Sequence, residues 1–199
     1  MNRLLMIPLT SLLLATPAAA EQPSEQDQRA MAREARQTSR DLVKQLGAAL
    51  KQALAQSGPE GAVGVCRDTA PSLAGQLSRQ TGWKVSRVSL KPRNPLIGLA
   101  DPWEQEVLLR FNGAAASGRN TANLEFSEVV SEPEGQYFRY MMALPVKPLC
   151  LTCHGSDETI PRSVRARLQQ EYPNDQATGY YAGQIRGAVT IKRKLDSGS

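Results

Sequence analysis

The chain has 199 residues, of which 41% are hydrophobic and 22% are charged, and its formal net charge is +5. This length suits one domain with its own hydrophobic core. The excess of positive charge is mild, and the basic residues are not interleaved with aromatic side chains, which argues against a nucleic-acid-binding surface.

Residues 1–20 have the three parts of a secretory signal peptide. A short basic start at Met1–Arg3 precedes an apolar stretch over residues 4–14, and Ala18–Ala20 forms a small-residue cleavage site. The apolar stretch is too short to span a bilayer. We therefore predict a mature chain that begins at Glu21, has no membrane span and is periplasmic in a Gram-negative bacterium. The alternative is an uncleaved anchor.

Residues 21–56 predict a long N-terminal amphipathic helix. Met31, Ala35, Leu42 and Leu46 fall on one stripe at helical spacing. Gly58-Pro59 is a typical end signal for such a helix. The stripe either packs against the rest of the chain or joins two copies in a homodimer, and the sequence leaves both open.

Residues 57–195 predict a second unit, in which helices alternate with strands. A helical stretch from Pro59 to Gln80 contains Cys66 and a break near residues 68–71. The expected elements that follow are a strand at 83–90, a loop at 91–95, a helix at 101–113 opened by Asp101-Pro102, strands at 123–131 and 136–146 around a turn at 132–135, a helix at 162–171, a loop at 175–183 and a strand at 184–192. About four antiparallel strands in this order predict an α+β, PAS-like domain.

Residues 150–154 read Cys-Leu-Thr-Cys-His, and C-x-x-C-H is the attachment signature of a c-type haem. The two thiols bond to the porphyrin, and the histidine becomes an axial ligand of the iron. We therefore predict one haem c, covalently attached at Cys150 and Cys153 and ligated by His154.

Three other uses of this motif are weighed against haem. A redox dithiol needs a helix N-terminus at its first cysteine, and no helical pattern runs through the motif. A zinc site with Cys66 would require the adjacent Cys153 and His154 to bind one tetrahedral ion, which strains the backbone. A disulfide between Cys150 and Cys153 would make His154 incidental.

The second axial ligand must be another residue type, because His154 is the only histidine in the chain. Cys66 is the leading candidate, and Met31, Met141 and Met142 are the thioether alternatives. A free thiol exposed after export would be oxidised or paired, whereas a thiolate bound to iron is protected. Alternatively, Cys66 is a buried, inert thiol that does not bind iron.

Haem propionates are carboxylates, and carboxylates favour arginine partners. Arg93, which follows the strand predicted at 83–90, is the first candidate for this role, with Arg87 and Lys91 behind it. Each is alternatively an ordinary surface charge.

Several separated motifs in the chain occur in the order seen in one bacterial family. They are Gly64-Val65-Cys66, Ala70-Pro71, Val88-Ser89-Leu90-Lys91, Arg93-Asn94-Pro95, Trp103-Glu104, Cys150–Gly155, Asp175–Tyr180 and Gly183–Ala188. Over about residues 40–193 the chain resembles periplasmic c-type haem-binding domains with a PAS-like fold. The resemblance implies His/Cys axial ligation by His154 and Cys66. Residues 96–100 depart from the family pattern, because they lack its second asparagine, which leaves the polar role of this loop open.

One haem, without a second metal cluster or a further acid–base constellation, does not predict an enzyme. Two other classes of function remain. A redox-responsive or gas-responsive haem sensor is favoured by the PAS-like order and the N-terminal helix, and it needs a separate signalling partner. An electron-transfer cytochrome is favoured by the haem alone, and it needs a redox partner.

Overall fold

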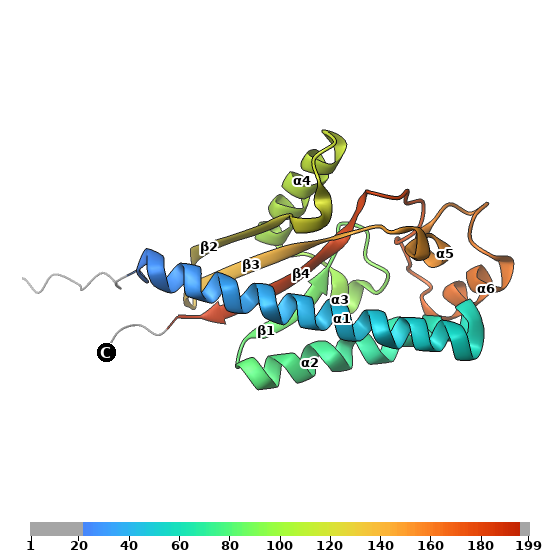
Figure 1. The fold of residues 1–199 in the computed structure, drawn as a ribbon, viewed down its shortest axis with the longest axis horizontal. Coiled ribbons are helices and arrows are strands. Elements are labelled where there is room, and N and C mark those ends of the chain that lie inside the picture. Colours follow the sequence, from blue (N-terminus) through green and yellow to red (C-terminus); the bar gives the residue numbers. More distant parts are fainter. Residues whose placement is uncertain (1–21, 196–199) are drawn as a thin grey trace, which may run out of the picture.

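The computed structural model describes residues 22–195 and has an α+β fold built on a four-stranded antiparallel sheet (Figure 1). The strands are β1 (Lys84–Val88), β2 (Glu125–Glu132), β3 (Gly135–Pro145) and β4 (Ile185–Lys194). Their order across the sheet is β1-β4-β3-β2, and every neighbouring pair is antiparallel. The predicted fold class and the predicted hairpin of β2 and β3 are confirmed.

The predicted signal peptide, residues 1–20, lies outside the described residues. Within residues 22–195, no helix is both long enough and apolar enough to cross a membrane.

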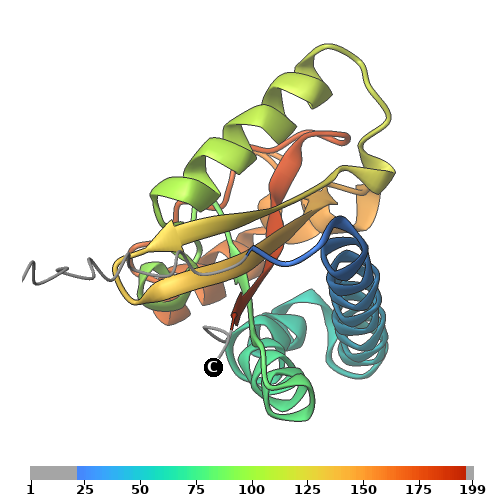
Figure 2. The ribbon, with the colours of Figure 1, turned by 90° about the vertical axis from the view of Figure 1, so that its left-hand side faces the viewer.

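Helices cover both faces of the sheet (Figure 2). The long helix α1 (Glu25–Gly64) and helix α2 (Ala70–Thr81) pack on one face, and α4 (Pro102–Ala116) packs on the other. Because successive strand residues point to opposite faces, Tyr140 of β3 lies in the core under α1 and α2, whereas Met141 lies in the core under α4.

Helix α1 is longer than predicted and kinked. Met31, Ala35 and Leu42 of the predicted stripe are buried against the chain's own sheet. Gly58 has a φ of 65°, which a continuous helix does not accommodate, and Pro59 follows it. The helix then resumes to Gly64, so Gly58-Pro59 marks a kink and not the end of the helical segment.

The predicted break near residues 68–71 is wrong. A π-helical turn, η1 (Val65–Thr69), joins α1 directly to α2, and Ala70 N donates to Val65 O, five residues back. Such a turn widens the helix by one residue, and π-turns often occur at functional sites. Cys66 lies in this turn.

Short helical turns occupy two other segments that the sequence left irregular. Helix α3 (Pro95–Gly98) follows the predicted loop and begins at Asn94, whose side chain accepts from Leu96 N. The attachment motif lies on a 3₁₀ turn, η3 (Pro148–Cys150), followed by α5 (Leu151–His154). The expectation that no helix runs through the motif is therefore wrong. The remaining elements are η2 (Thr121–Asn123) and α6 (Arg162–Glu171).

An ion pair fixes α1 to the far edge of the sheet. Both Arg36 Nε and Nη2 donate to the carboxylate of Glu125 on β2, with Nε 2.8 Å from Oε2. The Tyr140 hydroxyl donates to the same carboxylate at 2.7 Å. The hydrogen bond from Arg36 holds the pKa of Glu125 below its usual value, against the opposing effect of burial.

We expect Arg36→Gln to lower the free energy of unfolding by about 1 kcal/mol at neutral pH. The folded-state pKa of Glu125 is depressed, so this stabilisation is present above the carboxyl's unfolded pKa and is lost as the pH falls through the folded pKa. The difference between wild type and variant in urea unfolding should therefore shrink between about pH 5 and pH 3. Arg29→Gln, which removes an exposed pair with Glu25, is the matched control. An equal loss at pH 7 and pH 3 would contradict the assignment.

Candidate cofactor site

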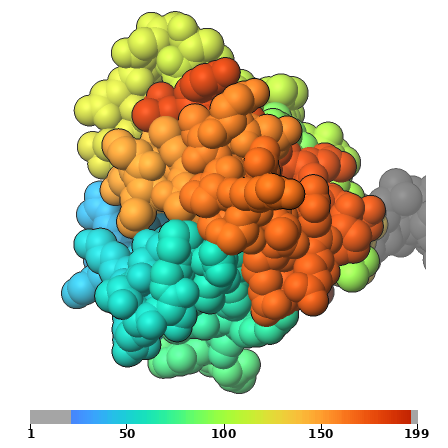
Figure 3. Space-filling model, turned by 90° about the vertical axis from the view of Figure 1, so that its right-hand side faces the viewer, coloured from blue at the N-terminus to red at the C-terminus, as the bar shows by residue number. Residues whose placement is uncertain are grey.

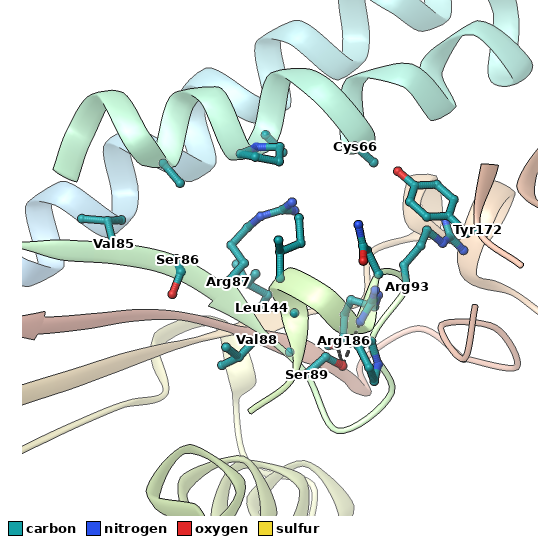
Figure 4. Close-up of a pocket in the computed structure, with 18 of the residues that line it drawn as sticks. Cys66, Val85, Ser86, Arg87, Val88, Ser89, Arg93, Leu144, Tyr172 and Arg186 are labelled. Atoms are coloured by element: carbon teal, nitrogen blue, oxygen red, sulfur yellow. Dashed lines mark hydrogen bonds between the residues drawn. The ribbon is translucent and has the colours of Figure 1, made fainter. Parts of the chain in front are cut away.

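A cavity of about 350 Å³ opens between β1 and the helical wall formed by η1 and α2 (Figure 4). Three of the residues predicted from the sequence, Cys66, Arg93 and His154, line this cavity. Much of the remaining wall is apolar, and it includes Ala70, Pro71, Val85, Val88, Ile97 and Leu144. The other two predicted residues, Cys150 at the end of η3 and Cys153 on α5, precede His154 in the chain and are not part of the cavity wall.

The ring of His154 is held by a backbone carbonyl. Nδ1 lies 2.7 Å from Ala177 O and 3.2 Å from Arg186 Nε. A carbonyl only accepts, so the shorter contact assigns the proton to Nδ1, and Arg186 cannot then donate to the same nitrogen. This tautomer leaves the lone pair on Nε2, the arrangement typical of histidine ligands in metal sites. Burial, with Arg93 and Arg186 nearby, holds the pKa of His154 well below its usual value, so the imidazole is neutral.

The loop before β4 also forms hydrogen bonds with the backbone of the attachment motif. Gly179 N donates to Gly155 O at 2.7 Å, and Tyr180 N donates to His154 O at 2.9 Å. The Tyr180 ring stands edge-on to the His154 ring, with 6.3 Å between the ring centroids. Gly155 is required by space, because a Cβ there would lie 2.6 Å from Leu151 O. These contacts fix His154 at the end of α5.

Arg93 is buried, and its guanidinium forms hydrogen bonds with the attachment motif and with the segment before β4. Its Nε donates to Asp175 Oδ2 at 2.9 Å, and its Nη2 donates to Cys153 O at 2.5 Å. Nη2 also lies 3.4 Å from Ala177 O. Two of the three guanidinium nitrogens are therefore engaged with protein acceptors. The predicted role of Arg93 toward a propionate stays a prediction, while its contacts give it a structural role.

Both cysteines of the motif are free thiols, so the structure gives no support to the disulfide alternative. Cys150 Sγ accepts from Lys147 N at 3.4 Å, and Cys153 packs against a small core formed by the end of α1 and α6. Figure 3 shows the end of the molecule where these segments meet. Burial raises the pKa of the Cys153 thiol. In the described part of the chain, no group of three or more Cys, His, Asp or Glu side chains is arranged to hold a metal ion, which leaves the zinc alternative without support.

Cys66 and the methionines are placed very differently. Cys66 is partly buried and lines the cavity from the helical wall. Met31 and Met142 pack in the core under α1 and α2, and Met141 packs in the core under α4. Of these four candidate sulfur ligands, only Cys66 shares the cavity with His154.

Two further arginines line the cavity. Arg186 Nη1 donates to Ser89 Oγ at 2.9 Å and to Lys91 O at 3.2 Å. The side chain of Arg87 makes no hydrogen bond or salt bridge with any residue in the range 22–195, although it is partly buried. Burial lowers the pKa of both arginines. Lys91, the third sequence candidate for a carboxylate partner, donates instead to Thr178 O at 2.5 Å.

Comparison with known proteins identifies the family. A family model described as Tll0287-like matches residues 17–193. The chain belongs to the Tll0287-like family. The solved structure of the cyanobacterial haem protein Tll0287 is 22% identical in sequence, with a TM-score of 0.60 over 90% of this chain and 100% of that chain. At this identity the likeness establishes the fold. No match was found among curated proteins.

In this Tll0287-like chain, sequence reasoning missed four residues of the site: Tyr172, Asp175, Ala177 and Arg186. Three of them fall in motifs that carried the resemblance, but nothing local indicated what they contact. Tyr172 lines the cavity from the end of α6 and had no sequence signal beyond its aromatic character. Ala177 acts through its backbone carbonyl, so its side chain gives no clue to its role.

We expect Asp175→Asn to lower the free energy of unfolding by about 3 kcal/mol, because it leaves the buried guanidinium of Arg93 without a counter-charge. The measurement is urea unfolding at neutral pH. Asp157→Asn, at an exposed position in the preceding segment, is the control and should change stability by less than about 0.5 kcal/mol. Equal stability of the two variants would show that the Arg93–Asp175 pair is not structural.

Proposed function

We propose that this chain is an exported protein that carries one covalently attached haem c and acts as a redox-responsive or gas-responsive sensor. The observation that carries the proposal is that Cys66 and His154 line one cavity directly beside the attachment motif. The haem-protein description of the cyanobacterial structure, which shares this fold, supports the same cofactor.

The residues of the cavity fit a haem. Cys150 and Cys153 are free thiols on one short turn, as attachment to a porphyrin requires. His154 is neutral, with its Nε2 lone pair available, and the wall combines apolar side chains with arginines, which suits a macrocycle that bears carboxylates. When bound, the haem supplies a one-electron iron couple and a coordination position for a small gas.

In this proposal Cys66 is the second axial ligand. The three thioethers of the chain from residue 22 onward lie in the two cores, so the thiol is the candidate sulfur that faces the same space as His154. A thiolate favours the ferric state, and its bond to iron weakens on reduction. Reduction would then free a coordination position for a gas, which is the response expected of a sensor.

The alternative function is an electron carrier, and one surface feature favours it. Leu96, Ile97 and Leu99 are exposed on and beside α3, and Leu96 is 93% exposed. Ile97 also lines the cavity, so this apolar loop lies at its edge. A redox titration with carbon monoxide separates the two functions: exchange of the thiolate on reduction favours sensing, and an unchanged ligand set favours electron transfer.

Export to the periplasm, a signalling or redox protein partner and dimerisation through α1 belong to the same proposal. The buried stripe of α1 faces its own sheet, so a homodimer would have to use the outer, polar face of this helix.

We expect the exported wild-type protein to carry one haem that acid–acetone does not extract and that appears in the mass of the intact chain. Substituting both Cys150 and Cys153 with Ala should abolish covalent attachment, because both thioether bonds are lost. Met142→Leu, a volume-conserving change outside the cavity, should leave haem content unchanged. A wild-type mass without haem would refute the proposed cofactor.

We expect Cys66→Ala to retain the haem but to change the ferric spin state and raise the reduction potential, because an anionic ligand is lost. Electron paramagnetic resonance and a potentiometric titration measure the two effects. Met141→Leu, in the core under α4, should match the wild type in both. If Cys66→Ala also matches the wild type, the thiol is not the ligand.

A further inference from the structure

The three arginines that line the cavity differ in what they bind. Arg93 is paired with Asp175 and with Cys153 O, and Arg186 donates to Ser89 Oγ and to Lys91 O. Among the three, only the side chain of Arg87 has no protein acceptor within the described residues.

Strand geometry places Arg87 inside the cavity. In β1 its neighbour two residues before, Val85, packs into the core under α1 and α2, and strand residues two apart share a face. The Arg87 side chain therefore rises from the sheet toward the helical wall, as Figure 4 shows. Cys66 and Tyr172 line the same cavity as Arg87.

Among the described residues, no Asp or Glu lines the cavity. The acidic side chains of the wall are the thiol of Cys66 and the phenol of Tyr172. The Arg87 guanidinium is partly shielded from water, and a shielded cation is stabilised by an anionic partner. A ligand that brings an anion to this point would supply the missing partner.

We propose that Arg87 binds a propionate carboxylate of the haem, and so holds the edge of the cofactor against β1. This inference rests on the proposed function, which supplies the haem. The planar guanidinium can donate two parallel hydrogen bonds to a carboxylate in a bidentate pair. The Cys66 thiolate is not the anionic partner of Arg87 in this proposal, because the proposed function assigns its sulfur to the iron. Arg87 thus takes the role that the sequence suggested first for Arg93, whose Nε and Nη2 already have partners.

The test compares Arg87→Gln with Lys84→Gln, each as the exported holoprotein. Lys84 lies on the same strand and carries the same charge, but it is exposed and does not line the cavity. We expect Arg87→Gln to keep the covalent haem, to shift the propionate bending band in the resonance Raman spectrum and to lower the reduction potential, since an uncompensated carboxylate stabilises ferric iron. Lys84→Gln should match the wild type, because solvent screens its charge.

Arg87→Lys is the second variant, used in case Arg87→Gln does not accumulate. Lysine keeps the positive charge but lacks the planar guanidinium that makes a bidentate pair. The propionate Raman band should therefore still shift, while the reduction potential changes less than in Arg87→Gln. An unshifted propionate band in the Arg87 variants overturns the inference. If the signal of the ferric iron ligands changes while the propionate band does not shift, Arg87 interacts with the Cys66 thiolate and not with a propionate. That outcome also overturns the inference. Absence of covalent haem from the wild-type mass refutes the proposed function itself, which distinguishes the two failures.

Discussion

The buried ion pair between Arg93 and Asp175 is the interaction on which the site depends. It joins the segment after β1 to the segment before β4, and the attachment motif is hydrogen-bonded to both through Cys153 O and His154 Nδ1. Because these groups are largely shielded from water, solvent cannot replace a lost partner. The orientation of the His154 ring is therefore set by residues that are distant in the sequence and never contact the lone pair on Nε2.

The charges that line the cavity favour an anionic ligand. Three arginines line the wall, whereas Asp175, the carboxylate that compensates Arg93, is not one of the lining residues. A wall of this kind binds an anion better than a neutral molecule, because the ligand's charge takes the place of water lost on burial. Arg93 and Arg186 already donate hydrogen bonds to protein acceptors, so Arg87 is the arginine available to bind an anionic ligand.

The π-turn gives the proposed sensor a direct connection to the long helix. Cys66 lies in η1, between the kinked end of α1 and the start of α2. A change of ligand at Cys66 would act on this junction before it reached any other part of the fold. Helix α1 packs along the sheet from Met31 to Leu42, and the kink at Gly58 separates this packed part from the junction at Cys66.

The sequence by itself determined the features that depend on neighbouring residues. These are the attachment motif, the single histidine, the alternation of the strands, the capped start of α4 at Asp101 and the helix disruption at Gly58. Strand alternation and helix capping act within a few residues, and so they can be read along the chain. For the same reason the π-turn at Cys66 was missed, since no local residue pattern specifies it.

Only the tertiary structure decided which side chains share the cavity. It brought Cys66 to the cavity of His154 and left Met31, Met141 and Met142 in the two cores. It gave Arg93 a partner in Asp175, whereas the side chain of Arg87 has none among residues 22–195. The three arginines of the cavity thus received different roles. The physical reason is that a buried charge is governed by whatever group packing places beside it, and that group comes from a distant part of the chain.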